Sequence, residues 1–390
     1  MRVLLVSMEF PPGPGGLGSH AFQLAAGLGR LGWSVSVLTN QSYSSDGQIA
    51  EFNHSQPFRV HRLDWPWRRG ERLYRYWCGF RERILRLPHV TVATGHRSAW
   101  LVADVMSPGA RPWLAIGHGS EFGGANPEYR ARTVRAFNKA TAIACVSDFT
   151  RRQMLTAGVS NREVTVIRNG ADPSEFPPLP ATRVRQFREL HSGQGSFCLL
   201  TVGAVTERKG QEVVIRALPL LLAAGLDVNY WIVGVPFERP RLAALAAELG
   251  VGERTHFLGA VPREDVNLAM RACDLFVMTS THTGGGDVEG FGIAVVEAAV
   301  CGKAAVVSGG SGLSEAVEDG VTGVVVEQGS SLATAAGIES LLRDDTRRLA
   351  MERAARARAE RDQTWAQKIL EYSTLLEGLA TPKDRRPSKS

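Results

Sequence analysis

The sequence predicts an α/β protein made of two doubly wound, Rossmann-like domains with parallel sheets. Short apolar runs alternate with amphipathic stretches from residue 2 to about residue 170, and the same alternation starts again at residue 197. This alternation is typical of βαβ units, whose strands form parallel sheets. With 390 residues, 44% of them hydrophobic, the chain is long enough to form two domains with separate cores.

The first domain is expected over residues 1–173. A helix is predicted at AFQLAAGLGRLG, because its apolar residues recur at helical spacing. Strands are predicted at the short apolar runs RVLLVS, WSVSVLT, VTVATG, WLAIGH and TAIACVS.

The alternation stops near residue 172, where the proline-rich run ADPSEFPPLP is followed by polar residues. Residues 174–196 are therefore expected to form a linker. The second domain is expected over residues 197–365, and residues 366–390 are expected to form a helix that returns to the first domain and then a basic tail. Two such domains are expected to face a central cleft, because parallel sheets bind ligands at the carboxyl ends of their strands.

Composition excludes several classes of protein. Five dispersed cysteines without a CxxC pair argue against a disulfide framework or a zinc site and favour a reducing compartment. Glu9 interrupts the first apolar run too early for a signal peptide, and no run approaches the ~18 apolar residues of a membrane span. The net charge of +6 is compatible with nucleic acid, anionic lipid or phosphorylated ligands. We expect a cytoplasmic protein, soluble or peripheral at the inner face of the cell membrane.

A glycine loop, PPGPGGLGSH, contains a GxGxxG pattern at Gly13, Gly15 and Gly18. A dinucleotide fingerprint places its first glycine in the turn that ends the strand and an acid about 20 residues later. Here residues 8–12 come between the strand and Gly13, and no acid follows the second strand before Asp46. This argues against an NAD-dependent oxidoreductase. A flexible loop, or an anion site at a helix N-terminus, agrees with the pattern.

A second glycine-rich stretch, at residues 284–327, places seven residues between Glu289 and Glu297. A helix that begins near Phe291 would have Glu289 just ahead of its N-terminus and Glu297 two turns inside. A bound anion or polyol would then face the backbone N–H groups of Gly290, Phe291, Gly292 and Ile293. By itself, the spacing of Glu289 and Glu297 also agrees with a helix whose two acidic side chains only contact solvent.

The stretch resembles the E-x7-E signature of the retaining GT-B glycosyltransferases of family 4, and GDVEGFG is most similar to mannosyltransferase-type members. Five further segments resemble the family, so that the resemblance covers nearly the whole chain: GPGGLGSH, GHGSEF, ACVSDFTRRQML, VIRNGADPSEF and VGAVTERKGQEVVI. The resemblance implies transfer of a hexose of the mannose or glucose type from a GDP- or UDP-linked donor. The acceptor would be a hydroxyl of a glycan or lipid-linked molecule, and the anomeric configuration would be retained.

The resemblance also implies catalytic roles for three residues. Lys209 would bind the donor diphosphate, whose charge grows as the leaving group departs. His118 would form a hydrogen bond with the donor sugar. Glu289 would contact the sugar hydroxyls, and we expect its side chain to touch only the ligand.

Other positions are implied in donor binding. Gly16 would approach the diphosphate where a Cβ would clash, and Glu297 would bind the ribose of the nucleotide. Val261, in the loop at residues 257–266, would pack on the base, although this loop does not identify the base. The amides of residues 290–293 would complete the phosphate site.

One position departs from the family pattern. The family usually has an arginine directly after the glycine of the phosphate-binding segment, where this chain has Ala204. Arg208 is a candidate replacement. Without one, the alternative is a non-catalytic nucleotide- or sugar-binding protein of the same fold. Asp287 and Glu289 also resemble a metal-binding DxD, but with Lys209 and a helix N-terminus available for the phosphates we expect no metal, and no other cofactor.

Residues 65–87 combine tryptophans with many arginines. On a helical wheel the apolar side chains gather on one face, and another face carries Arg68, Arg72, Arg75, Arg83 and Arg86. The segment is either a core helix with a solvated face or a site that docks on an anionic membrane. Nucleic-acid binding is not expected, because no recognised binding motif accompanies the charge.

Overall fold

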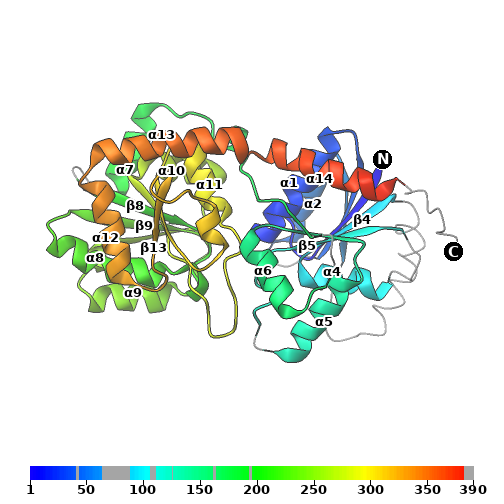
Figure 1. The fold of residues 1–390 in the computed structure, drawn as a ribbon. Helices are drawn as coiled ribbons and strands as arrows, with labels where there is room; N and C mark the ends of the chain where they lie inside the picture. Colours follow the sequence, from blue (N-terminus) through cyan, green and yellow to red (C-terminus); the bar gives the residue numbers. More distant parts are fainter. Residues whose placement is uncertain are drawn as a thin grey trace. The chain divides into compact units, whose positions relative to one another are not determined.

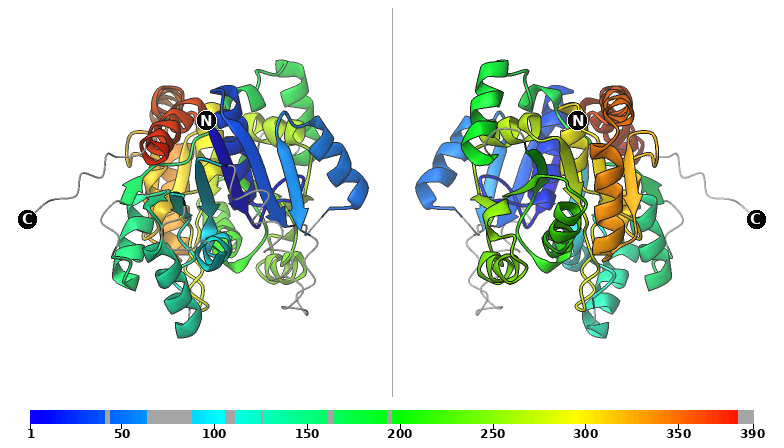
Figure 2. Two further views of the ribbon diagram at one scale, coloured as in Figure 1. Left: turned by 90° about the vertical axis from the view of Figure 1, so that its right-hand side faces the viewer. Right: turned by 90° about the vertical axis from the view of Figure 1, so that its left-hand side faces the viewer.

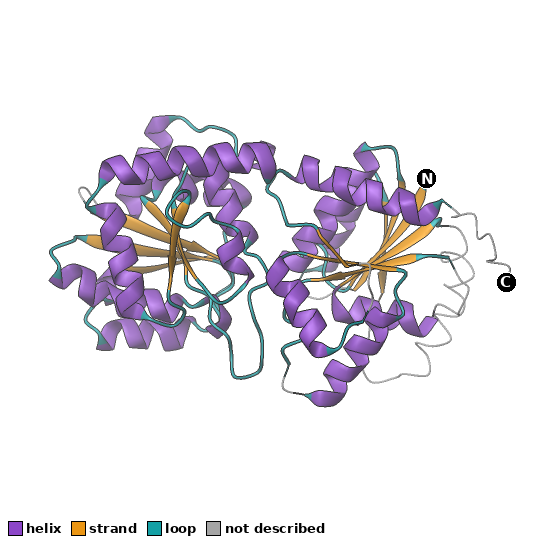
Figure 3. Ribbon diagram, viewed as in Figure 1, coloured by secondary structure: helices purple, strands orange, loops and turns teal. Residues whose placement is uncertain are grey.

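The structure, a computed structural model, describes residues 1–40, 44–63, 88–105, 111–124, 126–160, 164–192 and 196–381. The chain forms two compact units (Figure 1). Unit 1 combines Met1–Arg168 with Trp365–Ser390, and unit 2 is Asn169–Thr364. Each unit contains one parallel sheet with helices on both faces (Figure 3), which confirms the predicted fold class.

The sheet of unit 1 has the strand order β3-β2-β1-β4-β5-β6-β7, and all its strands are parallel. Figure 2 shows these strands fanning out with the twist usual for such sheets. The central strands are continuous apolar runs because helices bury both of their faces. The strands are β1 (Arg2–Ser7), β2 (Ser34–Asn40), β3 (Arg59–Leu63), β4 (Val90–Thr94), β5 (Trp113–Gly117), β6 (Ala142–Cys145) and β7 (Val164–Val166).

The helices of unit 1 include one from the far end of the chain, α14, which packs against α1. A Cβ at Gly27 of α1 would lie 2.4 Å from Cγ1 of Ile369 on α14. The two helices can approach this closely because residue 27 is glycine. The helices are α1 (Gly16–Arg30), α2 (Asp46–Ser55), α4 (Gly95–Val105), α5 (Pro127–Asn138), α6 (Asp148–Ala157) and α14 (Trp365–Ala380).

The sheet of unit 2 has the strand order β10-β9-β8-β11-β12-β13 and is also parallel. One face is covered by a large apolar cluster that includes Val214, Leu218 and Ile338. The strands are β8 (Phe197–Val202), β9 (Val228–Val233), β10 (Thr255–Gly259), β11 (Leu275–Met278), β12 (Ala305–Ser308) and β13 (Gly323–Val326).

Some α-helices of unit 2 lie between successive strands, others precede the first strand or follow the last, and short 3-10 helices occur in several loops. The α-helices are α7 (Ala181–Ser192), α8 (Gln211–Ala223), α9 (Arg239–Glu248), α10 (Arg263–Ala272), α11 (Ile293–Val300), α12 (Ser331–Leu342) and α13 (Asp345–Asp362). The 3-10 helices are η2 (Pro173–Glu175), η3 (Glu207–Lys209), η4 (Gly252–Arg254) and η5 (Gly312–Glu315).

The stretch at residues 174–196, which we expected to be a linker, contains helix α7. None of the residues of α7 is fully buried, although Val184 and Phe187 are half-buried.

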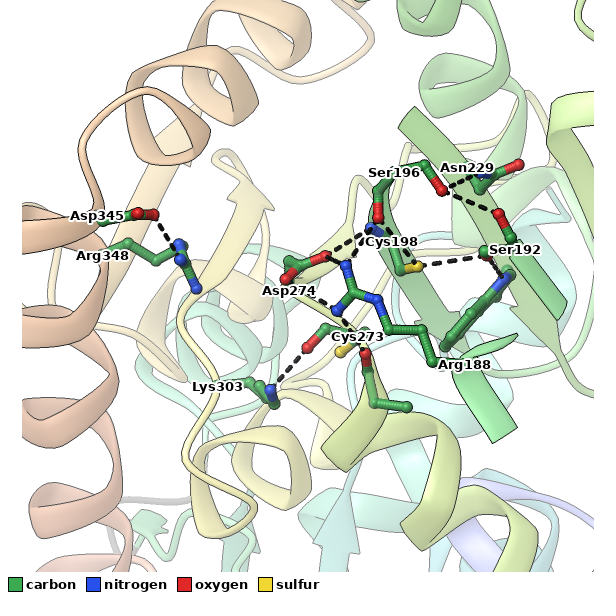
Figure 4. A network of polar contacts seen from close by, with 12 residues as sticks. Arg188, Ser192, Ser196, Cys198, Asn229, Cys273, Asp274, Lys303, Asp345 and Arg348 are labelled. Atoms are coloured by element: carbon green, nitrogen blue, oxygen red, sulfur yellow. Dashed lines mark hydrogen bonds and ion pairs between the residues drawn. The ribbon is translucent and has the colours of Figure 1, made fainter. Parts of the chain in front are cut away.

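Polar contacts hold helix α7: the Arg188 guanidinium binds both carboxylate oxygens of Asp274, at 3.1 and 2.6 Å (Figure 4). The indole N–H of Trp231 also donates to the Ser192 hydroxyl at 2.7 Å. Asp274 also accepts a hydrogen bond from the backbone N–H of Cys198, at the start of β8. The helix is therefore held at the amino-terminal ends of β8 and β11 by polar contacts, and Phe187 adds a packing contact, edge-on to the Trp231 ring at 5.6 Å.

Candidate functional site

The strand order in unit 2 reverses between the neighbouring strands β8 and β11, since β9 and β12 lie on opposite sides of this pair. The loops that follow β8 and β11 leave the same edge of the sheet. This is the place where open parallel sheets bind ligands. Lys209 follows β8 and Glu289 follows β11, so the fold brings together two residues that are 80 positions apart.

The loop after β8 is fixed to the loop after β11 by its backbone. Gly210 has a φ of +70°, and a Cβ at this position would lie 1.9 Å from the carbonyl oxygen of Thr279, so only glycine fits. The hydroxyl of Thr279 donates to the Gly210 carbonyl at 2.8 Å, and the Thr281 N–H donates to the Arg208 carbonyl at 2.9 Å. These contacts set the direction in which the two side chains of Arg208 and Lys209 leave η3.

Two cations meet one carboxylate at this edge. The Lys209 amine donates to Oε2 of Glu289 at 2.8 Å, and the Arg208 guanidinium contacts the same oxygen. Nε of Arg208 also lies 3.1 Å from Oδ2 of Asp287. The side chains of Lys209 and Glu289 are only 15% and 11% exposed, so these charges act with little screening by water.

The charges in this cluster depend on one another. Burial raises the pKa of Glu289, but the neighbouring Lys209 and Arg208 outweigh it and lower this pKa to about 2. Burial also lowers the pKa of Lys209, and Glu289 opposes that shift. Glu289 is therefore a carboxylate at neutral pH, an acceptor only, as hydroxyl recognition requires.

The expectation that Glu289 touches only a ligand is wrong. Its carboxylate is bound by Arg208 and Lys209, and its backbone carbonyl accepts a hydrogen bond from Gly312 at 3.0 Å. Sequence spacing does not reveal this, because the two cations come from a different loop. From the sequence, the direction of the Arg208 side chain could not be predicted. In the structure it points toward the carboxylate of Glu289, as Lys209 does.

Helix α11 begins at Ile293, close to the predicted start at Phe291. Gly292 is its N-cap and provides no side-chain cap, so the first amides of the helix stay open to an acceptor. Gly290 and Phe291 precede it, and the Phe291 side chain is buried. The residues predicted to supply phosphate-binding amides thus lie at this helix end, beside the carboxylate of Glu289.

Glu297 lies inside α11 and is buried, but it is already paired. The Arg263 guanidinium contacts its carboxylate and also binds Glu175 at 2.7 Å. Arg263 further stacks over the Phe176 ring at 4.4 Å. Sequence reasoning placed the loop at residues 257–266 in the site without recognising Arg263. Val261, in this loop just ahead of α10, is half-buried.

In unit 1 the strand order reverses between β1 and β4. Helix α1 begins at Gly16 after β1, and Gly15 is its N-cap without a side-chain cap. A Cβ on Gly16 would meet no described protein atom within 4 Å, so the described residues leave space at this position.

His118 directly follows β5, as predicted. The Glu121 carboxylate accepts hydrogen bonds from the backbone N–H groups of His118 and Gly119, at 2.7 and 2.6 Å. The ring Nε2 of His118 is buried and has no hydrogen-bond partner among the residues described. Burial, with a smaller effect of His96, lowers the pKa of His118 to about 4, so its ring is neutral at pH 7.

Residues 65–87, interpreted from the sequence as either a core helix with a solvated face or a membrane-docking segment, lie outside the described residues. In the part of the chain that the structure describes, no helix combines the length and the apolar character needed to cross a bilayer. Within the same residues, no three His, Cys, Asp or Glu side chains gather as they would around a metal ion.

Two family models match the chain and together cover most of it. Residues 183–358 match the family described as glycosyl transferases group 1, and residues 14–175 match glycosyltransferase family 4. The first match contains the cluster of Arg208, Lys209 and Glu289, and the second contains Gly16 and His118.

Individual proteins are similar over nearly the full length. A GDP-mannose-dependent α-(1-6)-phosphatidylinositol monomannoside mannosyltransferase of Mycolicibacterium smegmatis is 30% identical over 398 residues, which cover 96% of this chain and 98% of the relative. A glycogen synthase of Mycobacterium tuberculosis is 28% identical over 400 residues, which cover 94% and 92%. The solved structure of Anabaena HepE in complex with UDP-glucose has a TM-score of 0.82 at 22% identity, with 97% of this chain and 100% of that one covered.

Proposed function

The chain belongs to the family 4 glycosyltransferases with the GT-B fold, and we propose that it transfers mannose from GDP-mannose to a hydroxyl of a glycan or lipid-linked acceptor, with retention of configuration. That it moves a sugar from a nucleotide-sugar donor follows from the family. The choice of GDP-mannose is supported by the mannosyltransferase of M. smegmatis, whose name states this donor.

The main support for this reaction is that two cations, Arg208 and Lys209, contact the carboxylate of Glu289 beyond the carboxyl ends of β8 and β11. Lys209 and Arg208 would hold the donor diphosphate, with the open N-terminus of α11 beside them. Arg208 would supply the second cation that Ala204 does not, because its guanidinium already points to the same carboxylate as Lys209. This argues for a catalytic protein over a non-catalytic binder of the same fold.

Glu289 would have two successive partners. Without a donor, its carboxylate neutralises the two cations. When a diphosphate binds, it competes for Arg208 and Lys209, and the ionised Glu289 becomes available to accept hydrogen bonds from sugar hydroxyls. Glu297 would bind the ribose in the same way, after release or sharing of Arg263.

The transfer step would need no enzyme nucleophile. A bond forms between the acceptor oxygen and the anomeric carbon, on the face from which the diphosphate departs. The bond from that carbon to the phosphate oxygen breaks, and its electron pair stays with the diphosphate, whose charge Lys209 and Arg208 stabilise. The acceptor proton passes to the leaving phosphate oxygen. For His118 we propose a hydrogen bond from the neutral ring to the donor sugar.

A donor and acceptor panel tests this function. GDP-mannose, UDP-glucose and ADP-glucose are compared by thermal shift and by release of nucleoside diphosphate, because a ligand selective for the native state raises its melting temperature. Acceptors are a phosphatidylinositol monomannoside and glycogen, and the anomeric configuration of the product is read by NMR. We expect GDP-mannose to stabilise and react, and the linkage to be α. Turnover of UDP- or ADP-glucose onto glycogen alone would overturn the donor and acceptor proposed, and a β product would overturn retention.

A further inference from the structure

A second histidine lies against His118 in unit 1. His20, on α1, is completely buried, and its ring meets that of His118 edge to face, with 4.8 Å between centroids and 84° between planes. Burial lowers the pKa of His20 well below the usual value, as it does for His118, so both rings are neutral at pH 7. The contact is therefore one of packing between uncharged rings rather than a repulsion of like charges.

The C-terminal helix α14 encloses the other side of His20. Its Tyr372 hydroxyl lies 3.2 Å from Nε2 of His20, and the Trp365 ring packs edge-on at 5.4 Å. Tyr372 is fully buried, so this hydrogen bond is shielded from water. The bond fixes the rotation of the His20 ring, which a purely apolar contact would leave free.

Helix α14 is itself held firmly on α1. The Trp33 indole N–H donates to the Ser373 hydroxyl at 3.0 Å, one residue from Tyr372. The close approach of Ile369 to Gly27 adds a second fixed point. Because both helices are locked together, Tyr372 presents its hydroxyl to His20 from a rigid support.

The His118 ring has no such bond of its own. Glu121 holds only the backbone at His118 and Gly119, and Nε2 of His118 lacks a partner among the described residues. The orientation of this ring is therefore set by what it packs on. Among the described aromatic rings, His20 is the one that contacts it.

We propose that His20, held by Tyr372, is a positioning residue that orients the His118 ring toward its substrate. The proposal rests on the role of His118 given above. A ring that carries one directional hydrogen bond to a sugar must be aligned before the sugar arrives, and a misplacement of about 1 Å can cost about a hundredfold in rate. The pair Tyr372–His20 supplies this alignment, with His20 on α1 and Tyr372 on α14.

Tyr372→Phe and Ser373→Ala form a matched test. Each removes one buried hydroxyl from α14 that bonds a residue on or next to α1, so each costs similar stability. The ring resonances of His118 are followed in histidine-labelled full-length protein and assigned with His118→Ala. We expect them to shift in Tyr372→Phe and to stay in place in Ser373→Ala. Unchanged resonances in Tyr372→Phe, or equal shifts in both variants, would overturn the positioning role.

Kinetics with GDP-mannose give the second readout. His20→Leu is expected to lower kcat by about tenfold with little change in KM, since misalignment acts on the reacting geometry rather than on nucleotide binding. His20→Gln, whose amide can reach the Tyr372 hydroxyl, is expected to recover much of that loss. Equal kcat in His20→Leu and wild type, with His118→Ala inactive, would overturn the inference while leaving the role of His118 intact. Full activity of His118→Ala would instead overturn the proposed function of that residue, and with it the inference.

Discussion

The Lys209 amine lies 2.8 Å from a carboxylate oxygen of Glu289 that the Arg208 guanidinium also contacts. Glu289 is thus shared by two cations in a nearly buried place, and Asp287 is a second partner of Arg208. Each of the three side chains therefore depends on the others for its charge and orientation, and variants of any one of them affect both folding and catalysis.

Glu289→Ala is expected to abolish transfer and also to destabilise the protein. Removal of the shared carboxylate leaves the largely buried Lys209 without its ion-pair partner and Arg208 with Asp287 alone, and breaking such a buried pair costs roughly 3–5 kcal/mol. Urea unfolding and donor turnover measure the two effects, and Glu289→Gln, which keeps a hydrogen-bond acceptor, should lose less stability. Wild-type turnover in the alanine variant would show that the site is assigned to the wrong place.

Lys209→Ala should raise the barrier of transfer by about 2–4 kcal/mol, the scale of losing one preorganised group that stabilises developing charge. Arg208→Ala should behave similarly if Arg208 replaces the cation missing at Ala204. Steady-state kinetics with GDP-mannose measures both.

A double variant, Ala204→Arg combined with Arg208→Ala, is the control for Arg208→Ala. We expect it to restore part of the rate of transfer, because it returns a cation to the phosphate-binding segment. If the rate of transfer in Lys209→Ala fell by less than about threefold, Arg208 and the N-terminus of α11 would bind the diphosphate without help from Lys209.

Activity is expected to survive an excess of EDTA. Asp287, the candidate metal ligand of the D-x-E pattern, is bound by Nε of Arg208 at 3.1 Å, so its charge is engaged by a protein cation. Asp287→Asn should weaken donor binding through Arg208 and remain insensitive to added Mg²⁺. Complete inactivation by EDTA, reversed by Mg²⁺ or Mn²⁺, would restore Asp287 as a metal ligand.

Stability should fall when the pH drops from 6.5 toward 4. His96 and His118 have pKa values lowered to about 4, mainly by burial, so in this window the unfolded chain binds protons that the folded chain does not. Each histidine adds at most about 1.4 kcal/mol per pH unit to the slope. Glu289 has a pKa lowered to about 2 in the folded protein. Its ion pairs therefore stabilise the fold fully above pH 4.5, the ordinary pKa of glutamate, and this stabilisation is lost only as the pH falls below that value.

Urea unfolding at pH 7, 6 and 5 checks this expectation, with His118→Ala as the variant that should flatten the dependence. A free energy of unfolding that does not change between pH 7 and 5 would contradict the assignment of buried, neutral histidines.

Binding to vesicles tests the proposed membrane contact of residues 65–87. Association should increase with anionic lipid and weaken with salt, because the attraction is electrostatic at long range. Replacing Arg68, Arg72, Arg75, Arg83 and Arg86 with Gln should release the protein, while hydrolysis of the donor by water should persist. Equal flotation of the wild type and the five-Gln variant at low salt would reduce the segment to a solvated surface.

The fold could be predicted because parallel strands are short apolar runs that alternate with helices. Helix α7 was missed because it is rich in charged residues, contains no fully buried residue and is held largely by polar contacts of Arg188 and Ser192. Among site residues, Lys209 and Glu289 stood out by motif. The pairing of Glu297 with Arg263 could not be predicted, since it joins side chains of different helices whose directions depend on the packed structure.

The contacts of α14 with α1 also bear on the order in which the protein is made. Unit 2 is a continuous segment of the chain, Asn169–Thr364, whereas unit 1 needs residues from both sides of it. As the ribosome proceeds, unit 2 therefore has all its strands and helices before unit 1 has α14, although domains commonly fold from the N-terminus onward. Until Tyr372 and Ile369 are synthesised, the surface of α1 around His20 and Gly27 lacks its native partner, and transiently exposed apolar surface of this kind favours aggregation.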